Sequence, residues 1–203
     1  MKLLVLGSTG ATGRLVVDEA LAAGHHVRVL VRSPEKLTVA SPALEVITGH
    51  ATDPVEVGNA MAGADAVIST LGAANGSVMT DAIRAIIAGS AVSGVRRVVV
   101  LSSFAVLRER LSGPAGLMSR LAMGALVKDK TAAEDLLRSS NLDWTIVHAV
   151  RLTNGPATGG ARVVPGRATL KMGDSIARSD VAAWLLAEAA DESASRRAIA
   201  IAG

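Results

Sequence analysis

The 203-residue chain contains no cysteine and no tyrosine, and its large aromatic side chains are two tryptophans and one phenylalanine. Without cysteine there is no disulfide framework, no thiol nucleophile and no cysteine-ligated metal. The missing tyrosine excludes a phenolate as a general acid or base. Three large aromatic rings are also too few to form the stacking platform of a single-strand nucleic-acid binder.

The chain also lacks a large excess of charge of either sign, and it lacks long apolar runs. The net charge is +3, from 21 basic and 18 acidic residues, which is too mild to imply nucleic acid. No apolar run approaches the roughly 18 residues that a membrane span needs, and the first one ends too early for a signal peptide. No His, Asp and Glu spacing suits a metal. We therefore expect one cytoplasmic globular domain over 1–203, a monomer or homodimer with a small-molecule substrate, no bound metal and no membrane partner.

The most informative segment is a short apolar run, Lys2 to Leu6, that leads into glycines at 7, 10 and 13 and then a helical pattern. This order predicts a strand, a glycine-rich turn and a helix that together bind a dinucleotide pyrophosphate. Gly7 would permit the tight turn, Gly10 would let the backbone approach the phosphates, and Gly13 would let the helix pack closely. An ordinary strand-to-helix turn is the alternative. The predicted cofactor contacts here are Gly7, Thr9, Gly10, Ala11, Thr12, Gly13 and Arg14.

Strand and helix patterns alternate along the rest of the chain. The strands are apolar throughout, as expected when helices cover both faces of a sheet. The fold class is therefore α/β, a doubly wound parallel sheet (Rossmann fold), with a small substrate-side extension toward the C-terminus. Residues 103–127 and 148–180 would form the substrate side, 107–123 would border its opening or a dimer surface, and 153–167 would be a mobile lid. The expected strands are 2–6, 27–31, 44–47, 64–69, 96–101, 143–147 and 197–201, and the expected helices 14–23, 55–61, 78–92, 117–139 and 181–190.

Arg32 indicates which dinucleotide is bound. It follows the second predicted strand, where NAD-selective folds place an acid that binds the ribose 2′-hydroxyl. A guanidinium there can pair with a 2′-phosphate instead, which favours NADP(H). Lys36, one turn on, and Arg14 could reach the same phosphate, although all three could equally be solvated surface cations. Thr70, Leu71 and Gly72 end the fourth strand and would lie beside the cofactor, unless the last two only form a turn.

Several longer motifs carry a family resemblance. They are Gly-Ser-Thr-Gly-Ala-Thr-Gly at 7–13, Val-Leu-Val-Arg at 29–32, Val-Val-Val-Leu-Ser-Ser at 98–103, Lys-Thr-Ala-Ala-Glu at 130–134, Leu-Asp-Trp-Thr-Ile-Val at 142–147 and Ile-Ala-Arg-Ser-Asp-Val-Ala at 176–182. Together they resemble the atypical short-chain dehydrogenase/reductases, in particular the small NAD(P)-binding proteins that include biliverdin/flavin reductase B and the NmrA-like proteins. The resemblance runs essentially end to end and implies dinucleotide binding.

The chain departs from this family at its catalytic positions. Lys130 matches the lysine of the family's Tyr-x-x-x-Lys pair, but Leu126 stands at the tyrosine position. His148 and Ala149 replace an Arg-Pro that often follows the sixth strand, and His50 replaces an Asp that follows the third. The resemblance implies that Lys130 bonds the nicotinamide ribose.

Four further side chains near the ends of the fifth and sixth strands are candidates for chemistry. Ser102 or Ser103 could donate a hydrogen bond to a substrate carbonyl, although either could merely cap local backbone. His148 suits proton transfer near neutral pH, unless it is only a packed residue. Arg151 could bind an anionic substrate group through two hydrogen bonds.

Two functions are compatible with these residues. The first is an NADPH-dependent reductase that transfers hydride to a planar, electron-poor acceptor such as a flavin, quinone or tetrapyrrole, since such acceptors tolerate the missing tyrosine. The second is a non-catalytic NADP(H) sensor of the NmrA-like type, which would bind the cofactor without turnover.

Overall fold

Every predicted apolar run becomes a strand of one sheet that helices cover on both faces. The computed structural model describes the chain except residues 73–75, 108–123, 167, 169–172, 192 and 194. In the described part, the main sheet has the order β3-β2-β1-β4-β5-β6-β10-β8, parallel except for β8, which is antiparallel to β10. Its strands are β1 (Lys2–Leu6), β2 (His26–Val31), β3 (Leu44–Thr48), β4 (Ala66–Ser69), β5 (Arg97–Ser103), β6 (Asp143–Ala149), β8 (Arg162–Val163) and β10 (Arg197–Ala202).

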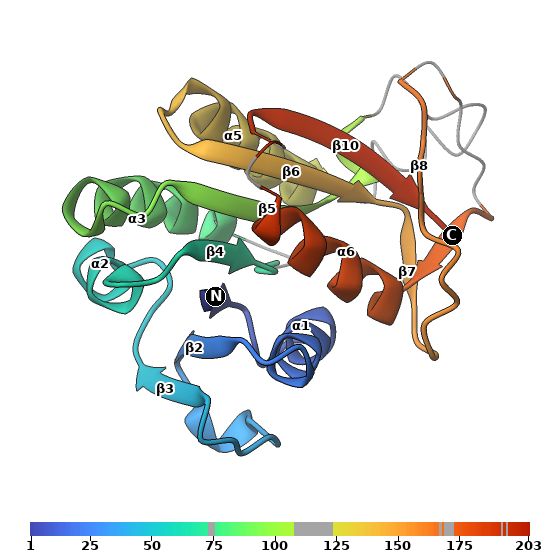
Figure 1. Cartoon of the computed structure of the whole chain (residues 1–203). Helices are drawn as coiled ribbons and strands as arrows, with labels where there is room; N and C mark the ends of the chain where they lie inside the picture. Colours follow the sequence, from blue (N-terminus) through green and yellow to red (C-terminus); the bar gives the residue numbers. More distant parts are fainter. Residues whose placement is uncertain (73–75, 108–123, 167, 169–172, 192, 194) are drawn as a thin grey trace.

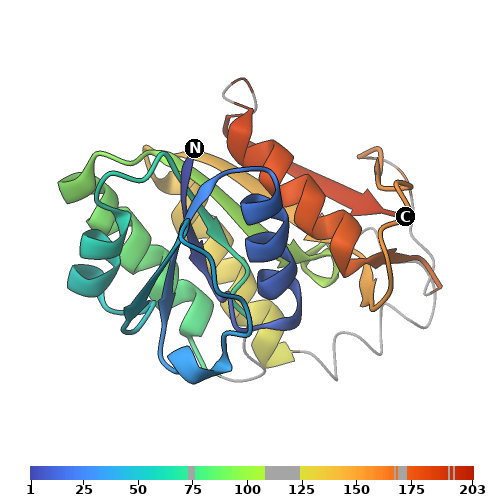
Figure 2. The same cartoon turned by 60° about the horizontal axis from the view of Figure 1, so that its bottom comes forward.

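The helices form two layers, one on each face of the sheet (Figure 1, Figure 2). Helices α1 (Ala11–Ala22) and α6 (Arg178–Ala190) pack together on one face, and α2 (Pro54–Met61), α3 (Val78–Ser93) and α5 (Gly124–Ser139) pack on the other. Short 3₁₀ turns, η1 (Pro34–Lys36) and η2 (Phe104–Val106), follow β2 and β5. The doubly wound α/β prediction is confirmed.

Burial explains why β1 is apolar on both of its faces. In β1, Leu3 and Val5 join the core beneath α1 and α6, whereas Leu4 and Leu6 join the core beneath α2 and α3. All four are fully buried. Because successive side chains point to opposite faces, a strand between two helix layers has no polar face.

The strand order indicates at which end of the sheet a ligand would bind. The chain runs outward from β1 to β2 and β3, then returns to the other side of β1 as β4. In such sheets the crevice lies beyond the carboxyl ends of the two strands where the winding reverses, here β1 and β4. The glycine-rich turn at 7–13 follows β1 directly and therefore lies at this edge.

Three short strands were not anticipated. The region predicted to be a lid, 153–167, includes β8, and a two-stranded parallel sheet joins β7 (Arg151–Thr153) to β9 (Ser175–Ala177). Strands of two or three residues are too short to show a hydrophobic period. In addition, β5 and β6 continue two residues beyond their predicted ends. Of the predicted helix 117–139, the first seven residues lie outside the described part, as does most of the segment 107–123.

The first half of the predicted lid is tied to the start of α6. Asp180 accepts hydrogen bonds from the backbone and hydroxyl of Thr158 and from the backbone N–H of Gly159. Ser179 donates to the carbonyl of Gly155. These contacts join segments about 20 residues apart, so the sequence did not indicate them. None of the helices in the described part of the chain has the length and apolar character to cross a bilayer.

The turn between β1 and α1 requires glycine at two positions. Gly7 has a φ of +83°, which glycine adopts without steric cost. A Cβ on Gly13 would lie 2.1 Å from the carbonyl oxygen of Gly7 and 2.7 Å from the hydroxyl of Thr70. Helix α1 therefore approaches β1 and β4 more closely than any side chain at position 13 permits.

We expect Gly13→Ala to destabilise the fold by about 1–3 kcal/mol, the usual cost of overpacking a rigid site. Gly10→Ala is the matched control, since Gly10 has an ordinary φ of −78° and its Cβ would meet only the Gly7 oxygen, at 3.2 Å. The control should change the free energy of unfolding by less than about 0.5 kcal/mol. Urea unfolding of both variants measures the difference, and equal stability would contradict the packing argument.

Candidate cofactor and active site

The start of α1 is arranged to receive an anion. Its N-cap residue, Gly10, has no side chain to cap the free N–H groups, and its first turn holds no acidic residue. By contrast, α2, α3 and α6 each have an acid in the first turn, namely Glu56, Asp81 and Asp180. Gly10 and Ala11 are exposed. Unsatisfied N–H groups and the positive end of the helix therefore face outward, as a pyrophosphate cradle requires.

Cations gather beside this helix start. Arg14 donates from Nη2 to the backbone carbonyl of Lys36 at 3.1 Å, which brings these two residues side by side. Arg32 follows β2 directly, and all three side chains are exposed. In the described part of the chain, no carboxylate forms an ion pair with any of them. They are thus available to an anionic group at the ends of β1 and β2.

Among the other predicted cofactor contacts, Thr70 holds the glycine-rich turn in place. Thr70 donates its hydroxyl to the carbonyl oxygens of Leu6 (3.1 Å) and Gly7 (3.3 Å), which ties the end of β4 to the glycine-rich turn. Thr12 is buried, Thr9 and Leu71 are half-buried, and Gly72 is exposed. Asp53, which follows the unusual His50, accepts hydrogen bonds from two backbone N–H groups and caps α2.

A buried polar cluster joins the carboxyl ends of β5 and β6 to α5. Ser102 and His148 are neighbours across the two strands. The Ser102 hydroxyl donates to Oε1 of Glu134 at 2.6 Å, and Nε2 of His148 lies 3.0 Å from both carboxylate oxygens of Glu134. The three residues are at most 5% exposed. Two of the candidate catalytic side chains are therefore directed at a third residue that the sequence analysis did not select.

Glu134 is ionised inside this cluster. Burial alone would raise its pKa. A hydrogen bond and an electrostatic interaction with His148, with further hydrogen bonds from Ser102 and Arg138, outweigh that effect and place the pKa of Glu134 below its usual value. Arg138, which donates to Oε2 of Glu134 at 3.3 Å, also lies over the ring of Trp144, 5.3 Å from its centre.

Lys130 is buried one helical turn before Glu134. Its Nζ lies 3.3 Å from the sulfur of Met79, and it forms no ion pair in the described part of the chain. Burial lowers the pKa of Lys130, while the charges of Glu134 and Asp129 oppose that shift. Asp129 itself accepts hydrogen bonds from the backbone N–H groups of Met79 and Thr80, which fastens α5 to the start of α3.

Ser103 and Arg151 remain outside the buried cluster. Ser103 is half-buried, and its oxygen accepts a hydrogen bond from the N–H of Ala105 at 3.3 Å, so it also serves the local backbone. Arg151 is exposed at the start of β7. Glu134 could have been selected from the sequence, because it lies four residues after Lys130 and therefore on the same helix face.

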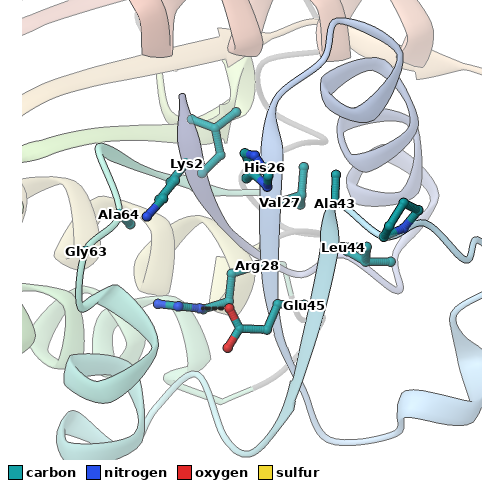
Figure 3. Close-up of a pocket in the computed structure, with 11 residues that line it drawn as sticks. Lys2, His26, Val27, Arg28, Ala43, Leu44, Glu45, Gly63 and Ala64 are labelled. Carbon is teal, nitrogen blue, oxygen red and sulfur yellow. Dashed lines mark hydrogen bonds and ion pairs between the residues drawn. The ribbon is translucent and has the colours of Figure 1, made fainter.

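A hollow of about 220 Å³ lies at the other edge of the sheet, by the amino ends of β1, β2 and β3 (Figure 3). Its wall includes Arg28, which pairs with Glu45 at 2.7 Å and also donates to the carbonyl oxygens of Ala60 and Ala62. This arginine has its partners within the protein, and the hollow is remote from the glycine-rich turn. Within the described residues, no group of three His, Asp or Glu side chains could hold a metal ion.

We expect Glu134→Gln to lower the free energy of unfolding by about 1–3 kcal/mol at pH 7, the cost of weakening hydrogen bonds to a buried charge. Because the pKa of Glu134 is lower in the folded than in the unfolded protein, its contribution exists above the ordinary glutamate pKa of about 4.3 and disappears as the pH falls through the folded-state value. Urea unfolding at neutral and acidic pH should therefore show the gap closing in acid.

Asp135→Asn is the control for this experiment, since Asp135 is an exposed carboxylate on the same helix. It should leave stability nearly unchanged at both pH values. A gap for the Glu134 variant that stays constant with pH would contradict the ionised state of Glu134.

Known proteins resemble this chain over most of its length. A (4-alkanoyl-5-oxo-2,5-dihydrofuran-3-yl)methyl phosphate reductase from Streptomyces griseus is 34% identical over 71% of this chain, which spans about half (46%) of that protein. The structure of ChuY, an anaerobillin reductase from Escherichia coli O157:H7, is 26% identical with a TM-score of 0.83, covering 99% of this chain and 96% of that one.

A short-chain dehydrogenase/reductase from Veillonella parvula, solved in complex with NADP, shares the fold with a TM-score of 0.86 at 20% identity, covering 100% of this chain and 94% of that one. The family model described as NAD(P)H-binding matches residues 7–192. The predicted relationship to atypical short-chain dehydrogenase/reductases and the prediction of a nicotinamide dinucleotide cofactor are thereby confirmed. The chain belongs to the NAD(P)H-binding family of Rossmann-fold proteins.

Proposed function

We propose that this protein is an NADPH-dependent reductase whose acceptor is planar and electron-poor, of the flavin, quinone or tetrapyrrole type. The observation that carries the proposal is the uncapped start of α1 beside the exposed cations Arg14, Arg32 and Lys36. That arrangement suits a pyrophosphate with a 2′-phosphate nearby. The reductases similar to this chain support hydride transfer as the activity.

When bound, NADPH supplies the hydride, and the protein supplies position and charge. The loop from Gly7 to Gly13 would hold the pyrophosphate, and Lys130 would bond the nicotinamide ribose, as the family resemblance implies. Ser103 and Arg151 are the candidates that can meet the acceptor directly. Ser102 and His148 contact Glu134 instead, so they would support the site from behind.

The proposed class of acceptor follows from the lack of a tyrosine to donate a proton. With no tyrosine in the chain, and with His148 bound to Glu134, the described residues set no phenol and no free imidazole at the ends of β5 and β6 as a proton donor. Positioned proton transfer normally contributes about 10²–10⁴-fold to a rate. An acceptor whose reduced anion is already stable can take its proton from water, so its rate of reduction depends little on a positioned proton donor.

The same observation favours one second function, a non-catalytic NADP(H) sensor. A protein that binds the cofactor but presents no proton donor is suited to reporting the redox state of the dinucleotide to a partner. The sensor and the reductase bind the same cofactor in the same place, so turnover distinguishes them.

We expect Arg32→Ala to weaken NADPH binding by about tenfold to a hundredfold while leaving NADH binding unchanged, because a charge-assisted contact to phosphate contributes roughly 1.5–3 kcal/mol. Calorimetric titration with both dinucleotides measures the effect. Arg84→Ala, which removes an exposed cation from α3, is the matched control and should alter neither affinity. Equal loss of NADPH and NADH would show that Arg32 does not read the 2′-phosphate.

We expect turnover with NADPH to be faster with a quinone or flavin than with an unactivated aliphatic ketone. The ketone needs a proton at the moment of hydride transfer, and the quinone does not. Oxidation of NADPH, followed by its absorbance against both acceptor classes, provides the comparison. Faster reduction of the ketone would contradict the argument from the missing tyrosine, and tight NADPH binding with no turnover on any acceptor would favour the sensor.

A further inference from the structure

Helix α5 is fastened at two points, and Lys130 lies between them. Asp129 binds the start of α3 through the N–H groups of Met79 and Thr80, each at 3.0 Å. Glu134 binds the ends of β5 and β6 through Ser102 and His148. Residues four apart share a helix face, so Lys130 and Glu134 lie on the same side of α5. The helix can neither rotate nor slide without breaking one of these buried contacts.

Lys130 has an unusual environment for an ammonium group. It is only 7% exposed, and the neighbour of its Nζ is the thioether sulfur of Met79, a weak acceptor. Burial disfavours its charge, and the carboxylates of Glu134 and Asp129 act against that effect. Asp129 already has three hydrogen-bond donors from Met79 and Thr80. Of these two carboxylates, Glu134 is the one that contacts the ends of β5 and β6, through Ser102 and His148.

We propose that Glu134 is a positioning residue for the nicotinamide end of the cofactor. It joins the carboxyl ends of β5 and β6 to α5 and so fixes the helical turn that carries Lys130. This inference rests on the proposed function in one respect, the assignment of Lys130 to the nicotinamide ribose. Glu134 itself touches neither cofactor nor substrate, and it acts through Lys130.

The test compares two ligands that differ at the nicotinamide end. NADPH carries both ends of the cofactor, whereas adenosine 2′,5′-bisphosphate carries the 2′-phosphate end and lacks the nicotinamide ribose. We expect Glu134→Gln to weaken NADPH binding about tenfold, equivalent to about 1.4 kcal/mol, and to leave binding of the bisphosphate unchanged. Calorimetry on the full chain measures both affinities without any turnover. Asp135→Asn, on the exposed side of the same helix, should change neither.

A double-mutant cycle shows whether Glu134 acts through Lys130. Lys130→Ala alone should cause the same selective loss of NADPH affinity, and adding Glu134→Gln to it should cause little further loss. If Glu134→Gln weakens both ligands alike, its role is structural support of the whole fold and the inference is overturned. Additive losses in the double variant would overturn it too.

Ser102→Ala keeps the charge and removes one hydrogen bond to Glu134, so it provides the test if Glu134→Gln does not fold. It should weaken NADPH about threefold and spare the bisphosphate, and an equal effect on the two ligands would overturn the inference. The binding assays remain decisive even if every acceptor proves inert. Normal NADPH binding by Lys130→Ala would instead refute the assignment of Lys130, and the inference with it, while leaving the reductase assay unaffected.

Discussion

The close approach of α1 to the sheet determines the rest of the cofactor site. Because position 13 has no side chain, the first turn of α1 lies directly against the carbonyl of Gly7 and the hydroxyl of Thr70. Thr70 in turn holds the end of β4 to β1 through two hydrogen bonds. These contacts place an uncapped helix start above the point where the strand order reverses. An anion at that point meets free N–H groups and the positive end of the helix together.

The second organising interaction is the buried carboxylate of Glu134. A buried charge is costly unless it is paired and hydrogen-bonded, and Glu134 meets that condition through Ser102, His148 and Arg138. As a result, Ser102 and His148, the two candidate catalytic side chains at the strand ends, are engaged by Glu134. In the arrangement that we propose, Ser102 and His148 support, through Glu134, the turn of α5 that carries Lys130.

These contacts also bear on the absence of tyrosine, because they engage the histidine that could replace it as an acid. Leu126 stands where the wider family has its phenol, and His148, the alternative acid, is turned toward Glu134. In the reductase that we propose, a site with neither a tyrosine nor a free histidine among the described residues at the strand ends would favour acceptors that stabilise negative charge themselves. If no acceptor reacted at all, the protein would bind the dinucleotide without turnover and act as a sensor, the second function proposed above. The difference between the two functions therefore depends on the acceptor rather than on the cofactor site.

The sequence by itself determined the fold class, the glycine-rich turn and the dinucleotide cofactor, because each depends on residues adjacent in the chain. Apolar runs without a polar face reveal strands covered on both sides, and three glycines at fixed spacing reveal one turn. Only the tertiary structure decided what Ser102 and His148 touch. Glu134 is 32 residues from Ser102 and 14 from His148, and it meets them only when α5 packs on β5 and β6. The contacts between Asp180 and Thr158 were invisible for the same reason, since no local pattern specifies which buried polar groups will meet across two elements.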